Sequence, residues 1–372
     1  MSVLNCCFGD VTENFDKKRI PLSGSQRDAR KGQYRYYGAQ GVIDYIDDFI
    51  FDGTYLLIAE DGENLKSQKQ NIAQIVEGKF WVNNHAHIVK SNGLCDLRYL
   101  CYCINTMDVS GYITGSAQPK LSQANLNAIP LQLPEINVQH KIADFLQMLD
   151  QKILINEKIN DNLLRQAQAL YKNRFIDLKP FNGEMPPDWQ LGTVSEIIEL
   201  HDSKRIPLSS RERANLTKIY PYYGATSVMD YVDRYLFDGI YLLLGEDGTV
   251  VDDKGFPILQ YVEGKFWVNN HAHIITGKNG FTVETLYLLF SLTNVRSIVT
   301  GAVQPKISQA NLNNVSVVIP SKAELSTFNS IVQPIFSQIR NLRAESDRLT
   351  ATRDILLPRL MSGEIDAANI QL

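Results

Sequence analysis

The side chains with the richest chemistry lie in a short run, Asn-Asn-His-Ala-His, that occurs twice in the chain. Amide and imidazole groups can pair with base edges in a DNA groove, and asparagine can hold adenine through two hydrogen bonds. The surrounding residues 79–89 are typical of a β-strand, so the first asparagine and both histidines are expected on one face and the second asparagine on the other. The candidate DNA contacts in this run are Asn83, Asn84, His85 and His87, and Asn269, Asn270, His271 and His273.

Two further roles are possible for this run. A His-x-His pair on a strand can chelate a metal ion. No third ligand is evident in both places, because all five cysteines lie in the first half of the chain, and we therefore expect no metal. A histidine cluster that only bonds the turn around it is as consistent with the residues as base contact is.

A second polar segment combines a glycine turn, a proline and a lysine. It covers residues 114–127 and 300–313 and contains Gln-Pro-Lys in both places. The alternative to DNA contact is that Gln-Pro and the following serine only turn the chain and cap a helix. The candidate DNA contacts in this segment are Gln118, Lys120, Gln304 and Lys306.

Positive charge and tyrosines gather near the start of each copy. A cationic surface with amphipathic rings suits a phosphate backbone, although charged runs are usually solvated surfaces. The candidates are Lys18, Arg19, Tyr36 and Tyr37, and Lys204, Arg205, Tyr222 and Tyr223. The other basic residues nearby are Lys17, Arg27, Arg30, Lys31 and Arg35, and Arg211, Arg213 and Lys218.

Carboxylates raise the rival hypothesis of an enzyme. Glu60-Asp61-Gly62 and Glu77-x-Lys79 both recur in the second half and superficially resemble part of a metal-dependent nuclease site. Each follows a strand-like run and lies beside glycine, which favours roles in turns and at strand ends. The sequence contains neither a Gly-rich cofactor loop after a strand nor a GxxxxGK[ST] motif. We therefore expect no catalytic residue and no cofactor in this chain.

All of these motifs repeat at one spacing. The segments that begin at Lys18, Tyr36, Val76 and Gln118 recur at Lys204, Tyr222, Val262 and Gln304, and every difference is 186. Because 372 is 2 × 186, the chain is two equal units with no net insertion. A repeat of this length predicts two copies of one domain, each with its own core.

Short aromatic and β-branched runs bounded by Gly, Asn, Asp or Pro predict β-rich modules. Such runs are 54–60, 79–89 and 127–134, and helices are expected from Leu97 and from Glu284. The predicted fold class is α+β, with two pseudo-symmetric β-rich modules separated by two long helices. The predicted domains are 1–135 (first module), 136–178 (central helical spacer), 179–321 (second module) and 322–372 (C-terminal helical spacer).

The long helices are predicted from heptad-like seams of apolar residues. Two such seams in one chain can bury each other, so we expect an antiparallel coiled coil, with polar Asn156, Asn160 and Ser346 helping to fix its register. The alternative is that each helix packs only on its own module. The seam residues are Ile142, Leu146, Leu149, Ile153 and Leu163, and Val332, Ile335, Ile339, Leu342, Leu349 and Leu356.

Composition says more about the cellular location of the protein than about its activity. The five cysteines are an odd number, and no run of 18 apolar residues occurs, so we expect a cytoplasmic protein without a membrane partner. The formal net charge of −4 does not by itself suggest a nucleic-acid partner, because whole-chain charge hides local patches.

Taken in order, these motifs resemble a known family. A Pro-x-Trp opening (Pro187, Trp189), YYGA, FWVNNHAHIV, TG-x-x-QPK-x-S-x-x-NL and a long helix, in duplicate, are similar to the specificity subunits of type I restriction-modification systems, as is the C-terminal LLPRLMSGEID. The resemblance covers essentially the whole chain. It implies target recognition domains joined by conserved helical spacers, with double-stranded DNA, two modification (methyltransferase) subunits and restriction/translocase subunits as partners. S-adenosylmethionine, ATP and Mg would then belong to those partners.

The duplication also predicts the form of the target. A seam of about 30 to 35 residues spans roughly 45 to 50 Å, more than one DNA turn of about 34 Å, so the half-sites should be separated by several unread base pairs. If the helices are antiparallel, a pseudo-twofold relates the modules, and identical candidate contacts predict similar, inverted half-sites. We therefore expect a nearly palindromic target.

Overall fold

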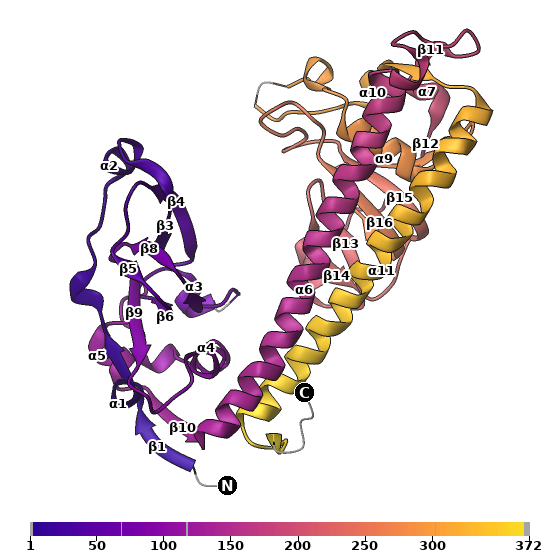
Figure 1. Ribbon diagram of the computed structural model, residues 1–372. Coiled ribbons are helices and arrows are strands. Elements are labelled where there is room, and N and C mark those ends of the chain that lie inside the picture. The colour runs from indigo at the N-terminus through magenta and orange to yellow at the C-terminus, as the bar shows by residue number, and fades with distance from the viewer. Residues whose placement is uncertain (1–2, 68, 117, 302, 368–372) are drawn as a thin grey trace. The chain divides into compact units, whose positions relative to one another are not determined.

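A computed structural model describes residues 3–67, 69–116, 118–301 and 303–367 (Figure 1). The chain divides into two compact units, one of residues 1–154 with 345–372 and the other of residues 155–344. Each unit holds one β-rich module and a segment of both long helices. The predicted α+β class is therefore confirmed, while the predicted domain boundaries stay a prediction.

The first unit contains three small sheets. Its strands are β1 (Val3–Cys7), β2 (Thr12–Asn14), β3 (Lys31–Gly38), β4 (Gly41–Ile46), β5 (Phe51–Asp52), β6 (Tyr55–Ala59), β7 (Ala73–Val76), β8 (Lys79–Val82), β9 (Ala86–Ser91) and β10 (Pro130–Pro134). Its helices are α1 (Phe8–Val11), η1 (Asp16–Lys18), α2 (Gly24–Asp28), α3 (Asn64–Ser67), α4 (Leu97–Thr106), η2 (Ser110–Tyr112), α5 (Gln123–Asn127) and the start of α6 (Ile136–Tyr171). The strand orders are β2-β9-β6-β7, β4-β3-β8-β5 and β1-β10, and among the strands described here β3 and β8 are the one parallel pair. Pairing of β1 with β10 joins the two ends of the module.

The second unit repeats this order 186 residues later. Its strands are β11 (Gln190–Thr193), β12 (Ile198–Leu200), β13 (Tyr220–Tyr223), β14 (Val228–Val232), β15 (Phe237–Gly245), β16 (Leu259–Val268), β17 (Ala272–Gly277) and β18 (Ser316–Ile319). Its helices are η3 (Lys172–Ile176), η4 (Lys179–Phe181), α7 (Val194–Ile197), η5 (Asp202–Lys204), α8 (Ser210–Ala214), α9 (Val283–Ser291), η6 (Arg296–Ile298), α10 (Gln309–Asn313) and most of α11 (Lys322–Met361). Here β15 and β16 run on without a break, so one six-stranded sheet replaces the two four-stranded sheets.

Two glycines form the corner between the sheets of the first module. Gly53 and Gly78 have φ of +118° and +80°, a region that side chains with Cβ rarely adopt, and their backbones bond each other in both directions at 3.1 and 3.2 Å. Their counterparts Gly239 and Gly264 lie opposite each other where β15 pairs with β16, again at positive φ. Both modules therefore bend their sheet at the same place.

The predicted strand over residues 79–89 is wrong in its middle. It is two strands, β8 and β9, which belong to different sheets, and residues 83–85 cross between them in a turn. The Asn83 side chain accepts from the backbone N–H of His85 at 2.8 Å, which closes the turn. The candidate side chains of this run therefore do not share the faces of one strand, because local turn bonding competes with the strand.

Each module has an aromatic core beneath this turn. In the first module, Phe51, Tyr55 and Phe80 pack ring against ring, and Phe237, Tyr241 and Phe266 repeat the arrangement in the second. A second small core holds Tyr36, Ile46 and Trp81. Aromatic burial of this kind supplies much of the apolar area that stabilises a small module.

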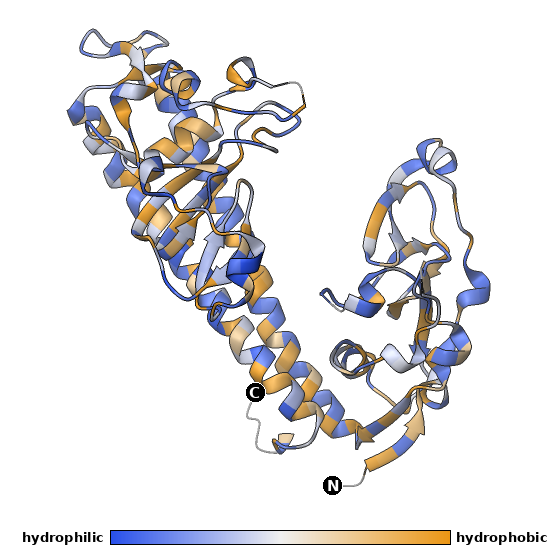
Figure 2. Ribbon diagram, turned by 180° about the vertical axis from the view of Figure 1, so that it is seen from behind, coloured by the Kyte–Doolittle hydropathy of each residue, from blue (hydrophilic) through white to orange (hydrophobic). Residues whose placement is uncertain are grey.

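In each unit, a segment of α6 runs antiparallel to a segment of α11. In the first unit Ile142 shares a core with Leu360, while Asp150 bonds Arg353 at 2.7 Å. In the second unit the Tyr171 ring contacts that of Phe328 at 5.7 Å. Every predicted seam residue is buried or half-buried, and Figure 2 shows polar and apolar residues alternating along both helices. The antiparallel coiled coil expected from the seams is confirmed.

Among the described residues, none of the helices combines the length and the apolar character needed to cross a membrane.

Candidate nucleic-acid interface

Three motifs that lie far apart in the sequence meet at the end of β6. Glu60, the residue after β6, accepts from Arg19 at 2.6 Å and lies 3.0 Å from the Lys120 ammonium. The neighbouring Asp61 bonds His85 at 2.7 Å. The Lys-Arg, Asn-Asn-His and Gln-Pro-Lys motifs therefore converge on two consecutive carboxylates.

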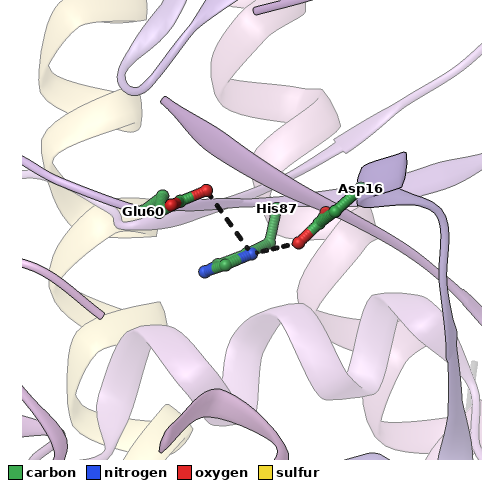
Figure 3. A group of neighbouring side chains, drawn as sticks. All are labelled: Asp16, Glu60 and His87. Carbon is green, nitrogen blue, oxygen red and sulfur yellow. Dashed lines mark hydrogen bonds and ion pairs between the residues drawn. The ribbon is translucent and has the colours of Figure 1, made fainter. Parts of the chain in front are cut away.

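The buried His87 joins this group, with its ring beside Asp16 and Glu60 (Figure 3). Its Nδ1 lies 2.6 Å from an Asp16 carboxylate oxygen, and its Nε2 lies 2.7 Å from the carbonyl oxygen of Leu121. Both ring nitrogens of this buried side chain therefore have an oxygen partner within hydrogen-bond distance. We call Asp16, Arg19, Glu60, His87 and Lys120 the first polar cluster.

Backbone geometry brings these side chains together. The Asn14 side chain accepts from the Asp16 N–H at 2.8 Å, and the other Asp16 oxygen accepts from the N–H of Ile88 at 2.9 Å. Thr114 and Lys120 exchange backbone hydrogen bonds at 2.8 Å, which closes the Gln-Pro-Lys loop, and the Leu121 N–H donates to the Glu60 carbonyl oxygen at 2.8 Å, which docks the segment at the end of β6. Gly115 is needed there, since a Cβ on it would lie 2.3 Å from the Gln118 carbonyl oxygen.

The second module builds the same group. Asp202, Arg205, Glu246, His273 and Lys306 form the second polar cluster. Arg205 bonds Glu246 at 2.5 Å, Lys306 lies 3.1 Å from Glu246, and His273 bonds Asp202 at 2.6 Å. His273 also donates to the Ile307 carbonyl oxygen at 2.8 Å. The duplication thus preserves a buried ionic network as well as the backbone.

The cations of each cluster hold its carboxylates ionised. Burial alone would raise the pKa of Asp16, but the hydrogen bond and charge of His87 outweigh it, so the pKa lies below its ordinary value. Burial would likewise raise the pKa of Glu60, but hydrogen bonds from Arg19 and Lys120 lower it overall. The pKa values of Asp202 and Glu246 are lowered in the same way by His273 and Arg205.

The clusters correct one expectation about metal ligands. Two further ligand types do recur beside the histidine, because ligand atoms of Asp16, Glu60 and His87 lie within 4.8 Å of one another, as do those of Asp202, Glu246 and His273. The donor set nevertheless fits a metal poorly. Both imidazole nitrogens already have hydrogen-bond partners within the chain, and Arg19 and Lys120 already neutralise Glu60.

Exposed side chains surround each cluster. In the first module Asn84 and Gln118 are exposed, Lys18 is exposed on η1, and His85 and Lys120 keep about half of their side-chain surface. The corresponding exposed or half-exposed side chains of the second module are Lys204, Asn270, His271, Gln304 and Lys306. These groups offer amide, imidazole and ammonium donors on one surface of each module, as a ligand with phosphates and base edges requires.

Comparison with known proteins decides the family. A family model described as the type I restriction modification DNA specificity domain matches the chain twice, over residues 5–165 and 186–351. The chain belongs to this family of DNA specificity subunits. The two matches fall on the two modules with their helices.

Curated relatives agree with this assignment. The specificity subunit is 25% identical to a putative type I restriction enzyme specificity subunit of Haemophilus influenzae, over 87% of this chain and 85% of that protein. It is 26% identical to the MjaIX specificity subunit of Methanocaldococcus jannaschii, over 75% and 71% of the two chains. The crystal structure of a type I restriction-modification S subunit from M. genitalium shares the fold, with a TM-score of 0.65, 15% identity and coverage of 97% and 96%.

Several predicted contacts of the specificity subunit are buried instead. Tyr36 is fully buried, and its hydroxyl accepts from the Leu22 N–H at 2.9 Å, while Tyr37 packs against Phe80. The side chains that lie in the interior, and so cannot reach a ligand in this structure, are Tyr36, Tyr37, Asn83, His87, Tyr222, Asn269 and His273. Arg19 and Arg205 are committed to their clusters, and Tyr223 is half-buried against Phe266. These side chains pack in the core and form internal hydrogen bonds. Sequence alone cannot distinguish such roles from contact with a ligand, because the same amphipathic residue types suit both.

The predicted basic loop is largely neutralised by the neighbouring strand. Arg27 and Lys31 both bond Asp44 on β4, and Arg30 bonds Asp47. In the second module Arg213 and Lys218 bond Asp230 in the same way, and the pKa of Asp230 falls to about 2 through the hydrogen bond from Lys218. These cations therefore brace the β3–β4 and β13–β14 hairpins.

The geometry around Glu77, Lys79 and Glu263 does not support the nuclease hypothesis. Glu77 is exposed just after β7, and the exposed Lys79 begins β8, with its ammonium 4.6 Å from the Phe49 ring centre. Glu263 contacts Arg340 on α11. The carboxylates that do gather with a histidine are Asp16 and Glu60, and Asp16 was not among the predicted site residues. Its recurrence as Asp202, two residues before the repeated Lys-Arg pair, was the available signal.

Proposed function

We propose that each module of this specificity subunit reads one half of a bipartite DNA target. The observation that carries the proposal is the recurrence of the polar cluster and its exposed rim at one spacing of 186 residues. Two equal surfaces in one chain suit two similar pieces of one ligand. The exposed rim residues Asn84, His85 and Gln118 would contact base edges, and Lys18 and Lys120 would contact phosphates.

The long helices would set the distance between the half-sites. Helices α6 and α11 contain 36 and 40 residues, which correspond to about 54 and 60 Å at 1.5 Å per residue. This length exceeds one DNA turn of about 34 Å, so several unread base pairs would separate the half-sites. Since the candidate contacts are the same residue types in both modules, the half-sites would be similar and inverted, giving a nearly palindromic target.

The same helices would offer docking surfaces to two methyltransferase subunits. Exposed apolar residues on α6, among them Met148, Leu154, Ile155 and Ile159, support this part of the proposal, because a helix that packed only within its chain would not need them. The partners would supply S-adenosylmethionine chemistry, and restriction subunits would supply ATP-driven translocation and cleavage. This chain would supply sequence recognition alone.

Selection of bound duplexes from a random library tests the proposal. The chain would be combined with its methyltransferase partner at a stated salt concentration, and the recovered DNA would be sequenced. We expect an enriched pair of inverted, similar half-sites with a fixed gap. No enrichment, or nicking by the isolated chain with a divalent metal, would overturn the proposal in favour of the nuclease.

A further inference from the structure

We infer that the tips of the β3–β4 and β13–β14 hairpins read the bases at which the two half-sites differ. The residues assigned to this role are Gln40 and Ile43 in the first module and Thr226 and Met229 in the second. The inference rests on the proposed function and adds to it the residues that would make the target imperfectly palindromic.

The position of each tip carries the first step. The backbone N–H of Asn83 donates to the Tyr37 carbonyl oxygen at 3.0 Å, and Asn269 bonds Tyr223 at the same distance. Each hairpin is therefore fixed directly beside the turn that presents Asn84 or Asn270. A ligand that touches the exposed asparagine also meets the hairpin tip.

A β-bulge carries the second step. In β3–β4, Tyr36 pairs with Asp44 and Tyr37 pairs with Val42, so Ile43 has no partner across the ladder. The second module repeats the irregularity, with Met229 in the unpaired place. Bulges turn a side chain out of the regular alternation and occur beside binding sites. Ile43 and Met229 are accordingly 52% and 56% exposed.

Contacts with the turn carry the third step. A Cβ placed on Gly38 would lie 3.1 Å from Ile43 and 3.7 Å from the Asn83 amide, so both side chains border the same glycine. In the second module the Asn269 amide lies 3.3 Å from the Met229 sulfur. The bulged side chain and the turn thus form one surface in each module.

The differences between the copies carry the last step. Around the clusters the exposed Asn, His, Gln and Lys residues are identical, whereas the hairpin tips change from Gly-Ala-Gln-Gly-Val-Ile to Gly-Ala-Thr-Ser-Val-Met. Gln40 and Thr226 are exposed. A glutamine amide can hold adenine through two hydrogen bonds, and a threonine hydroxyl accepts several bases. Aliphatic and thioether groups contact the thymine methyl with different shapes.

Exchange of the tip residues tests the inference. In the intact chain with its methyltransferase partner, the Q40T/I43M variant gives the first module the two side chains that the second already carries at the matching tip and bulge positions. Selection from a random library should then return two alike half-sites, and affinity for the wild-type target should fall by roughly tenfold or more. The reciprocal T226Q/M229I variant should make both half-sites resemble the first one.

The outcomes separate this inference from the proposed function. The unchanged half-site in each variant reports that the chain is folded, and Leu4→Gln, at an exposed position of β1 where the second module has Gln190, should leave the target as in the wild type. An unchanged target in both exchange variants, or identical half-sites in the wild type, overturns the inference alone. Failure of the wild-type chain to enrich any sequence overturns the proposed function as well.

Discussion

The Nδ1 atom of His87 lies 2.6 Å from a carboxylate oxygen of Asp16, and the same distance joins His273 to Asp202. Each imidazole ring is buried, and its other nitrogen bonds a backbone carbonyl. The buried carboxylates of each cluster are tolerated because they are paired and hydrogen-bonded. The two clusters therefore hold in place the backbone segments that carry the exposed residues around them.

Acid should unfold the modules through these carboxylates. The pKa values of Asp16, Glu60, Asp202 and Glu246 are lowered in the folded chain, so the unfolded chain binds protons first as pH falls. Their stabilisation is complete above the ordinary carboxyl pKa near 4 and is lost as pH drops through the lowered values. Thermal unfolding measured against pH should show a steep fall in Tm below about pH 4. An equally steep fall in the double variant D16N/D202N would contradict this assignment.

Substitutions of the neighbouring cations Arg19 and Lys18 should affect different properties, stability for Arg19 and DNA binding for Lys18. Arg19→Met leaves Glu60 with one cation fewer in a largely buried site and should cost about 3 kcal/mol of unfolding free energy. Lys18→Met, at the adjacent exposed position, should leave Tm unchanged but weaken DNA binding and reduce the slope of log affinity against log salt by about 1. Chemical denaturation and salt-dependent titration measure the two effects. A fall in Tm for Lys18→Met would place that residue in the cluster instead.

Substitutions of the buried Tyr36 and of the exposed Asn84 should affect different properties, stability for the first and DNA binding for the second. Tyr36→Phe removes one buried hydrogen bond to the Leu22 backbone and should cost about 1 kcal/mol of stability without changing the selected target. Asn84→Ala should leave stability unchanged and weaken binding of the selected duplex by about 1 to 3 kcal/mol, with little effect on random DNA. Equal losses on selected and random DNA would mean that Asn84 contacts only the backbone.

Within the first unit, apolar packing should outweigh ion pairing between the long helices. Leu146 is fully buried, and Leu146→Ala should cost about 2 to 5 kcal/mol. Arg353 and Asp150 are 28% and 36% exposed, so a double-mutant cycle on this pair should give about 1 kcal/mol or less. A coupling energy as large as the cost of Leu146→Ala would show that the pair fixes the helices.

The repeat, the α+β class, the helical seams and the family followed from the sequence because each depends on pattern alone. Whether a single polar side chain is buried or exposed could not be predicted in this way. Asn83 and His87 are as suited to base contact as Asn84 and His85. Asn83 instead bonds within the turn between β8 and β9, and His87, on β9, bonds the distant Asp16. Asp16 was missed because its partner is 71 residues away, and such a pairing leaves no local signal.

A gap-shift titration tests the central claim most directly. Affinity of the chain with its methyltransferase partner would be measured on the selected duplex and on the same duplex with five base pairs added between the half-sites. About half a DNA turn is thereby inserted, which moves one half-site to the opposite face. If two modules read one bipartite target, affinity should fall toward that of a duplex with a single half-site. Full affinity on the lengthened duplex would contradict that account.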